Sequence, residues 1–439
     1  MAYRVGAVSL GCNKNRVDTE SALGVLKDHG YEITSSPEAA DILLVNTCGF
    51  IGPAKEESIN TILDMAEYKK SGRCRLLVVT GCLAQRYEKE LLEELPEIDL
   101  LLGVNQYARL PELISQAMQG RRISSCKDDL GYFEQERVLT TPFYSAYIRI
   151  GEGCSNRCAF CAIPLIRGPY RSREESAVLD EIRRLADAGV REHILVAQDT
   201  TRYGSDRGER HALPGLLRRA AEIDGVTWLR TLYCYPDETN EELLDVLAEH
   251  PKVCSYLDLP VQHISPDILR RMRRRGTRED ILNCVRGARE RNLTLRTSLI
   301  VGFPGETEDQ FKELLDFVEA SEFDRLGAFM FSPEENTPAA DMPDQIPEEV
   351  KQERLDRLMT LQQGISLKRN QARVGTEETV LITDISAAEG TALGRSSREV
   401  PEEDGQILLR FRGPAPATGS FVSARITGAE PYDLMGELL

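Results

Sequence analysis

Between residues 146 and 331 the chain alternates an apolar strand with a helical stretch six times. This alternation predicts a parallel sheet, because each helix must cross back over the sheet before the next strand begins. Six such units in series predict a partial barrel, and barrels of this kind carry their sites at the carboxyl ends of the strands. The predicted strands are 146–150, 193–198, 227–233, 256–262, 294–301 and 325–331.

Three cysteines follow the first of these strands, in the string GCSNRCAFCAIP. Cys154, Cys158 and Cys161 have C-x3-C-x2-C spacing, which brings three thiolates onto one short loop. Thiolates are the usual ligands of iron–sulfur clusters, and three of them leave one iron of a 4Fe-4S cluster open. Zinc is the competing interpretation, but a zinc site usually needs a further cysteine or histidine pair, and none follows here.

The segment 1–130 also alternates strands with helices, with strands predicted at 3–10, 41–46, 75–80 and 99–104. It therefore predicts a separate parallel α/β domain. Cys12, Cys48 and Cys82 follow the first three of these strands, each beside a glycine. Because parallel strands end at one edge of a sheet, we expect the three thiols to converge there. They indicate a second iron–sulfur cluster or a catalytic metal with an open position; the alternative is three small buried residues.

Residues at the ends of other barrel strands are further candidates for binding a ligand or for catalysis. Gln198 and Asp199 follow the second barrel strand, and Gly302 and Gly305 follow the fifth, in the string IVGFPGE. The glycines would let a ligand approach the backbone closely, or they simply form a strand-to-helix turn. His263 follows the fourth strand, where a lone histidine is usually structural.

Arginines follow the cysteine triplet in the string IRGPYRSR. Arg167, Arg171 and Arg173 are candidates for binding a substrate carboxylate, since a guanidinium can hold a carboxylate bidentately. The alternative is that they are solvated surface residues. A denser run, from Arg270 to Arg275, fits a phosphate or an acidic surface, and its role for substrate or partner stays open.

After a long polar helix predicted over 345–371, the tail 372–439 has short alternating strands, which predict a small all-β barrel. Such barrels often bind oligonucleotides, but this tail has six arginines, no lysine and eleven acidic residues. The whole chain has 54 basic and 71 acidic residues, a net charge of −17. Both imbalances disfavour nucleic acid and favour a basic protein partner.

The sequence thus predicts an α/β protein with three domains, over residues 1–130, 140–371 and 372–439. It has no run of 18 apolar residues and no signal-peptide pattern at its start. These features predict a cytoplasmic chain without a membrane span.

The cysteine triplet, with Phe160 before its last cysteine, resembles that of the radical S-adenosylmethionine (SAM) enzymes. The resemblance implies that the triplet is catalytic. It would hold a 4Fe-4S cluster whose open iron chelates S-adenosylmethionine. The residues implied to contact this cofactor are Phe160, Gln198, Asp199, Gly302 and Gly305.

Over essentially the whole chain, the order of the three parts is similar to the methylthiotransferase family of these enzymes, which ends in a TRAM-like barrel. Strings such as SLGCNKNRVDTE, LDLPVQHIS and FMFSPEENTPA resemble the branch that modifies an aspartate of small-subunit ribosomal protein 12. The tRNA-modifying branch typically has Gln-Met where this chain has Asn13-Lys14, and serine where it has His263. Both departures point away from tRNA.

The resemblance implies β-methylthiolation of that aspartate. Cys12, Cys48 and Cys82 would hold a second 4Fe-4S cluster that delivers sulfur. The implied partners are ribosomal protein 12, free or in the ribosome, and an electron donor such as flavodoxin or ferredoxin. Two alternatives stay open, a tRNA adenosine methylthiotransferase and a non-catalytic iron–sulfur protein that binds the ribosome.

Overall fold

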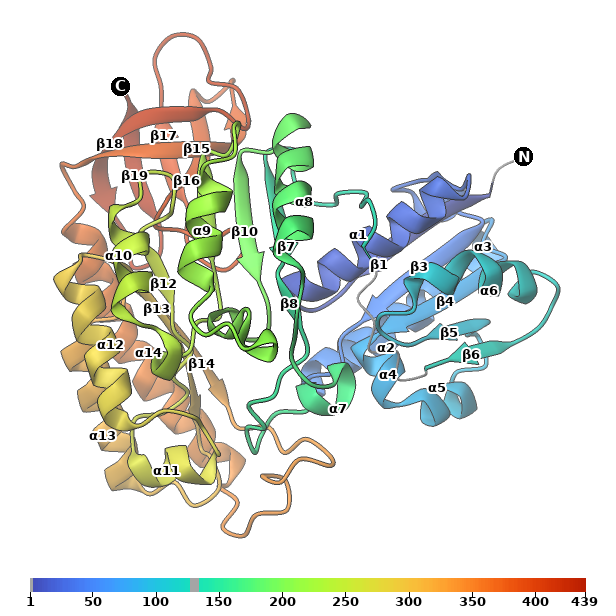
Figure 1. Cartoon of the computed structure of the whole chain (residues 1–439), viewed down its shortest axis with the longest axis horizontal. Helices are drawn as coiled ribbons and strands as arrows, with labels where there is room; N and C mark the ends of the chain where they lie inside the picture. The colour runs from blue at the N-terminus through green and yellow to red at the C-terminus, as the bar shows by residue number, and fades with distance from the viewer. Residues whose placement is uncertain (1–2, 127–133) are drawn as a thin grey trace.

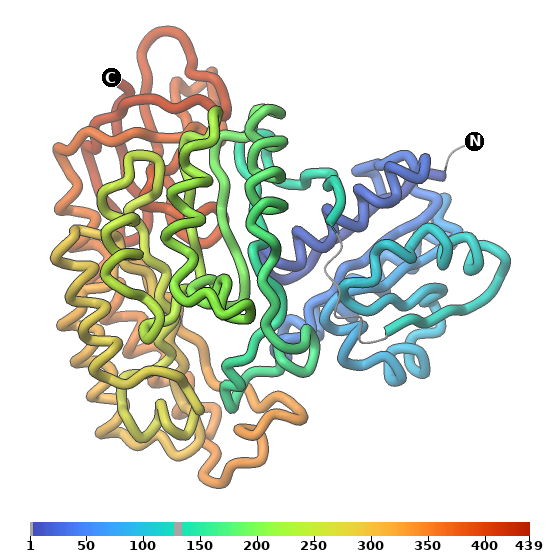
Figure 2. The backbone as a smooth tube through the Cα atoms, in the orientation of Figure 1, coloured from blue at the N-terminus to red at the C-terminus, as the bar shows by residue number. Residues whose placement is uncertain are grey.

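The computed structural model describes residues 3–126 and 134–439, which form three parts (Figure 1). An N-terminal α/β domain lies beside a central open barrel, and a small β-barrel covers one end of that barrel (Figures 1 and 2). The predicted α/β fold class is confirmed. The predicted boundaries at residues 1 and 130 lie outside the described residues, and the division into three ranges stays a prediction.

The N-terminal domain is built on a six-stranded parallel sheet in the order β2-β1-β3-β4-β5-β6. Its strands are β1 (Arg4–Ser9), β2 (Glu32–Ile33), β3 (Ile42–Thr47), β4 (Leu76–Gly81), β5 (Leu100–Leu102) and β6 (Ile123–Ser125). Its helices are α1 (Asn13–Asp28), α2 (Gly52–Ala66), α3 (Tyr68–Ser71), α4 (Cys82–Arg86), α5 (Glu88–Glu94) and α6 (Leu110–Ala117). The four predicted strands are present. Strands β2 and β6 were missed, because β2 has only two residues and β6, unlike the equally short β5, is not an apolar run.

The central part contains the six predicted barrel strands. They are β7 (Ser145–Arg149), β10 (Glu192–Val196), β11 (Trp228–Thr231), β12 (Tyr256–Asp258), β13 (Thr294–Val301) and β14 (Arg325–Met330). They form two parallel sheets, β11-β10-β7 and β12-β13-β14, joined by a bridge between Leu229 and Val253. In the part of the chain that the structure describes, β7 and β14 do not pair, so the barrel is open between them.

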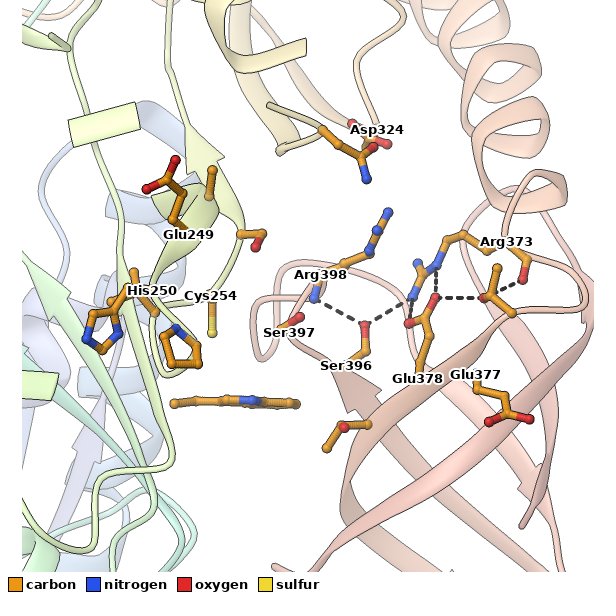
Figure 3. A pocket seen from close by; sticks show the side chains of 18 of the residues that line it. Glu249, His250, Cys254, Asp324, Arg373, Glu377, Glu378, Ser396, Ser397 and Arg398 are labelled. Atoms are coloured by element: carbon orange, nitrogen blue, oxygen red, sulfur yellow. Dashed lines mark hydrogen bonds and ion pairs between the residues drawn. The ribbon is translucent and has the colours of Figure 1, made fainter. Parts of the chain in front are cut away.

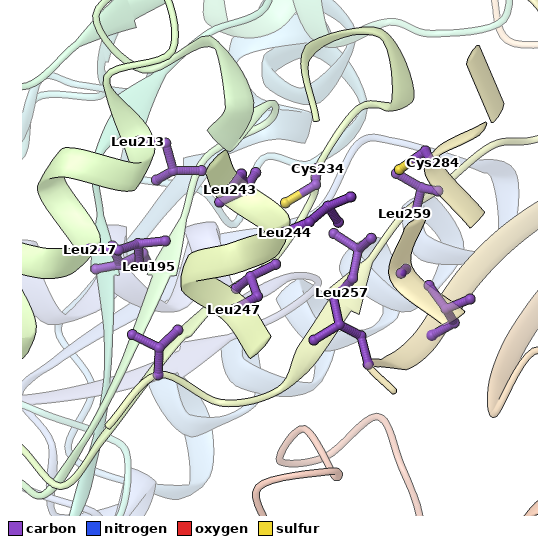
Figure 4. Packing of buried hydrophobic residues seen from close by; sticks show 14 of the residues in the cluster. Leu195, Leu213, Leu217, Cys234, Leu243, Leu244, Leu247, Leu257, Leu259 and Cys284 are labelled. Carbon is purple, nitrogen blue, oxygen red and sulfur yellow. The ribbon is translucent and has the colours of Figure 1, made fainter. Parts of the chain in front are cut away.

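Helices cover the outside of this barrel. They are α8 (Glu175–Asp187), α9 (Leu213–Ala221), α10 (Glu241–Glu249), α11 (Pro266–Arg271), α12 (Arg278–Glu290) and α13 (Glu308–Ser321). Leucines of the strands pack against leucines of α9 and α10, for example Leu257 of β12 and Leu247 of α10 (Figure 4). This apolar layer fixes the helices on the strands and leaves the strand ends for polar residues.

A short antiparallel ribbon lies at the carboxyl end of β7. It pairs β8 (Gly151–Glu152) with β9 (Arg171–Ser172). The chain between these two strands carries the cysteine triplet and α7 (Ile163–Arg167). The sequence analysis missed this ribbon, and it holds both ends of the triplet loop together.

The tail forms the predicted five-stranded barrel, closed in the order β15-β16-β17-β19-β18. Its strands are β15 (Glu377–Ser386), β16 (Thr391–Ser396), β17 (Ile407–Arg410), β18 (Phe421–Ala429) and β19 (Leu434–Leu438). The long polar helix is also present, as α14 (Glu348–Gln371), which begins after Pro347 and packs against β14 and α13.

Several acidic residues of the tail pair with the chain's own arginines. They lie at the contact with the central barrel or with α1, so part of the tail's negative charge is neutralised internally. This weakens the expectation that the acidic tail docks a basic partner. The pairs are Glu399–Arg325, Glu402–Arg16 and Glu403–Arg296.

Among residues 3–126 and 134–439, no helix has both the length and the apolar character that crossing a membrane requires.

Candidate functional site

The cysteine triplet lies on a loop whose backbone is fixed from both sides. The N–H of Cys154 donates to the carbonyl of Gly168 at 3.0 Å, and the N–H of Cys161 donates to that of Cys158 at 3.1 Å. Cys154 and Cys158 are buried, and burial raises the pKa of Cys154 to about 11. Bound metal ions would supply the positive charge that buried thiolates need. Three thiols on one fixed loop therefore fit the donor set of a 4Fe-4S cluster.

The basic run from Arg270 to Arg275 turns towards this loop. Nη1 of Arg274 donates to Sγ of Cys158 at 3.6 Å, and the guanidinium lies 4.2 Å from the ring centroid of Tyr235. Among the described residues, no carboxylate lies within ion-pair distance of Arg274. The sequence analysis did not single out Arg274, because only the fold brings it to Cys158, 116 positions away.

The second cysteine set lies at the carboxyl edge of the N-terminal sheet, after the neighbouring strands β1, β3 and β4. Cys12 is exposed and caps the start of α1, Cys48 follows β3, and Cys82 opens α4. A Cβ added at Gly11 would lie 2.9 Å from Sγ of Cys48, so the backbone beside Cys12 touches Cys48. Burial raises the pKa of Cys82 to about 12.

These positions confirm that the three strand ends share one edge, and the thiols there fit a cluster as donors. In the described part of the chain, no three His, Cys, Asp or Glu side chains are grouped closely enough to hold one metal ion. The ligand roles of all six cysteines stay predictions.

Helix α7 connects the two cysteine sets. It begins two residues after Cys161, and its last residue, Arg167, reaches the N-terminal domain. Nη2 of Arg167 donates to Sγ of Cys82 at 3.5 Å and to Asp18 at 2.8 Å, while Nη1 donates to Glu152 at 3.0 Å. Arg149 of β7 also pairs with both acidic residues. This network is buried and carries equal numbers of positive and negative charges, so it holds the domains together beside both cysteine sets.

Two of the three arginines predicted to bind a substrate carboxylate are engaged in internal ion pairs. Arg167 and Arg173 are buried, and Arg173 pairs with Glu134 and Glu181. A substrate carboxylate would have to displace these internal partners, which argues against the predicted role for both residues. Arg171 is half-buried and donates to the carbonyl of Pro169 at 2.8 Å.

Two of the residues expected to contact the cofactor follow β10 and support the triplet loop. Asp199 accepts from Asn156 at 2.8 Å and from Thr201 at 2.6 Å, so its carboxylate braces the loop between Cys154 and Cys158. Gln198 donates to Glu152 at 3.0 Å, and its Oε1 is buried without a partner among the described residues. That oxygen leaves Gln198 able to accept a hydrogen bond from a cofactor.

Phe160 packs on an apolar cluster that includes Phe303 and Phe331. It thereby anchors the end of the triplet loop on the barrel.

The two glycines of the string IVGFPGE allow side chains, rather than a ligand, to approach the backbone. Both have positive φ, and an added Cβ would lie 2.3 Å from Lys351 Cγ at Gly302 and 1.9 Å from Arg271 Nη1 at Gly305. The N–H groups of Gly302 and Phe303 donate to the carboxylate of Glu306, which closes the turn. These contacts favour the turn interpretation.

His263 is fully buried in the barrel. Its Nδ1 accepts from the N–H of Ser265 at 3.0 Å, and burial, with the nearby Arg354, lowers its pKa to about 3. A neutral, enclosed imidazole that holds a turn is structural, which argues against the predicted substrate contact.

A cavity of about 620 Å³ lies away from the six candidate cysteines, where the amino ends of the barrel strands meet the tail (Figure 3). Arg373, Glu378 and Ser396 line it, and Arg373 donates hydrogen bonds to both Glu378 and Ser396. None of the six candidate cysteines lines this cavity.

Three family models match separate parts of the chain. Residues 148–318 match the radical SAM superfamily, residues 4–103 match the uncharacterized protein family UPF0004, and residues 374–439 match the TRAM domain. The radical SAM methyltransferase TsrM from Kitasatospora setae has a similar fold, with a TM-score of 0.56 and 19% identity over 77% of each chain. The radical SAM enzyme OxsB has a TM-score of 0.50 and 14% identity, covering 82% of this chain and 56% of its own. The fold and the triplet loop thus define a radical SAM enzyme.

Relatives that align with this chain along nearly their full length identify the family to which it belongs. A ribosomal protein uS12 methylthiotransferase RimO from Desulforamulus reducens is 49% identical over 99% of both chains. The one from Heliobacterium modesticaldum is 48% identical over 100% of this chain and 96% of its own length. The one from Geobacter sulfurreducens is 49% identical over 99% of this chain and 98% of its own length. The chain belongs to the RimO family of radical SAM methylthiotransferases.

Proposed function

We propose that this chain methylthiolates the β-carbon of an aspartate in ribosomal protein uS12. The observation that carries the proposal is the approach of the two cysteine sets across one interface, where Arg167, from the helix that follows Cys161, contacts Cys82. Relatives named for this activity align over the whole chain, which supports the same substrate. A single active centre that uses both sets needs them at a fixed separation, and α7 supplies a rigid connection.

Each cysteine set has a distinct role in this proposal. Cys154, Cys158 and Cys161 would hold the 4Fe-4S cluster that binds S-adenosylmethionine, and Cys12, Cys48 and Cys82 would hold a second 4Fe-4S cluster. When bound, these groups would supply the sulfur, the methyl group and a radical that removes a hydrogen atom from the substrate. Gln198 would accept a hydrogen bond from the cofactor through its unpartnered Oε1.

The remaining residues keep this arrangement rigid. Asp199 and Asn156 hold the triplet loop, and Arg167 with Glu152 and Asp18 fixes the N-terminal domain. The electron would come from a small carrier such as a flavodoxin or ferredoxin, and the reaction would take place in the cytoplasm.

The test is anaerobic reconstitution with iron and sulfide, followed by reductant and S-adenosylmethionine. Purified uS12 and bulk tRNA are offered in separate tubes and analysed by mass spectrometry. We expect a methylthio group on an aspartate of uS12. A methylthio group on tRNA adenosine would overturn the substrate, and 5′-deoxyadenosine failing to form would favour a non-catalytic binding protein.

A further inference from the structure

An unpaired amino group lies at the start of α1, directly after the candidate ligand Cys12. Lys14 is 7% exposed, and its Nζ makes no hydrogen bond or ion pair with any described residue. The Nζ lies over the ring of Tyr233, 3.3 Å from the centroid. Burying an ammonium group without a carboxylate or phosphate is unfavourable, so this position calls for an anion from outside the chain.

Asn13, the neighbour of Lys14, presents an unused acceptor. Its Nδ2 donates to the hydroxyl of Tyr233 at 3.1 Å, but its Oδ1 is buried and has no partner among the described residues. Buried amide oxygens normally accept a hydrogen bond. An unpaired cation beside an unpaired acceptor is complementary to an aspartyl residue, which offers a side-chain carboxylate and a backbone N–H.

Tyr233 is held in a conformation that points it at both residues. Its φ is +62°, which is unusual for a bulky side chain, and its N–H donates to Asp258 at 2.8 Å. Backbone strain of this kind persists where the surroundings enforce it, and it clusters at functional sites.

The groups whose negative charge would act on Lys14 are Cys12, Glu403 and Asp258, and the two carboxylates among them pair with Arg296. They lie beyond ion-pair distance of Lys14. The charge of Lys14 is therefore available to a ligand.

We propose that Lys14 and Asn13 bind the target aspartate: Nζ of Lys14 holds its carboxylate, and Oδ1 of Asn13 accepts a backbone N–H of the substrate. This assignment rests on the function proposed above. The amino end of α1 adds a favourable dipole for a carboxylate. Because Lys14 follows Cys12 by two residues and α1 lies alongside β7 (Figure 1), the aspartate would be held between the two domains.

The test compares full-length reconstituted wild type, Lys14→Met and Lys14→Arg on uS12 and on a uS12 variant with asparagine at the target position. Binding is measured by fluorescence anisotropy, and KM and kcat by mass spectrometry. We expect wild type to prefer aspartate over asparagine at least about tenfold in binding and in KM. Lys14→Met should abolish this preference, mainly by weakening binding of the aspartate form about tenfold, and Lys14→Arg should retain much of it.

Lys27→Met is the matched control, since Lys27 is an exposed lysine on the same helix, and it should behave as wild type. Cleavage of S-adenosylmethionine without uS12 should be equal in wild type and Lys27→Met. If Lys14→Met keeps the preference for aspartate, the assignment is overturned while the proposed function stands. If wild type binds and modifies no uS12, the proposed function falls, and the assignment falls with it.

Discussion

Nη2 of Arg167 lies 3.5 Å from Sγ of Cys82, although the two residues are 85 positions apart and belong to different domains. The same guanidinium pairs with Asp18 and Glu152, so its removal leaves buried carboxylates with less compensation. We expect Arg167→Met to lower the free energy of unfolding by about 3–5 kcal/mol. Urea denaturation measures the loss.

Arg183→Met is the control: it removes an exposed ion pair with Asp180 and should change the free energy of unfolding by less than about 1 kcal/mol. Equal effects of the two changes would contradict the structural role of Arg167.

The two cysteine sets should be separable by mutation. Cys48→Ala should abolish methylthiolation of uS12 and leave reductive cleavage of S-adenosylmethionine, because that cleavage needs the triplet alone. Chromatographic assay of 5′-deoxyadenosine and mass spectrometry of uS12 measure the two activities. Cys74→Ala, in the apolar core of the same domain, should keep both activities. Loss of cleavage in Cys48→Ala would show that the division of roles is wrong.

Arg274 should raise the reduction potential of a cluster held by the triplet. Its charge has no carboxylate partner among the described residues and lies 3.6 Å from Cys158 Sγ, and positive charge and hydrogen bonds at sulfur favour the reduced cluster. In a Cys12/Cys48/Cys82→Ala background, Arg274→Gln should lower the ratio of reduced to oxidised cluster about tenfold at a fixed potential, which is ~59 mV for one electron.

Redox titration followed by electron paramagnetic resonance measures this ratio, and iron content checks that the cluster is retained. Arg273→Gln removes an exposed arginine at the adjacent position and should leave the ratio nearly unchanged. A shift of the same size in both variants would assign the effect to overall charge.

The contact between the tail and the central barrel should weaken in acid. Burial alone would raise the pKa of Glu399, but Arg373 and Arg325 lower it to about 2. Because this value lies below that of an unfolded glutamate, Glu399 stabilises the fold above about pH 4.5, and that contribution disappears as the pH falls towards 2. It amounts to about 3 kcal/mol.

Thermal denaturation between pH 7 and pH 3 measures this dependence. Glu399→Gln should lower stability at pH 7 and flatten the acid-dependent loss. The exposed Glu389→Gln is the control and should retain the wild-type profile. A Glu399→Gln profile as steep as that of wild type would show that other carboxylates cause the loss.

Periodicity and spacing were enough to predict most of the fold. The six barrel strands and four of the six strands of the first domain are apolar runs, most of them buried along their whole length, and strands of the tail alternate buried with exposed residues. The position of Cys12, Cys48 and Cys82 at one edge of the sheet was also predictable, since parallel strands end at a common edge. Strands β2, β8 and β9 have only two residues each, and β6 is not an apolar run, so none of them leaves such a pattern.

The partners of charged residues could not be predicted, because charge in a sequence does not reveal which opposite charge the fold will bring near. Arg167 and Arg173 looked available and are buried in ion pairs, whereas Arg274 and Lys14 have no carboxylate partner among the described residues. The sequence by itself determined the strands, the helices and the two cysteine sets, since these depend on local periodicity and topology. Only the tertiary structure decided which cations are neutralised, because ion pairs form between residues that are distant in the chain and adjacent in space.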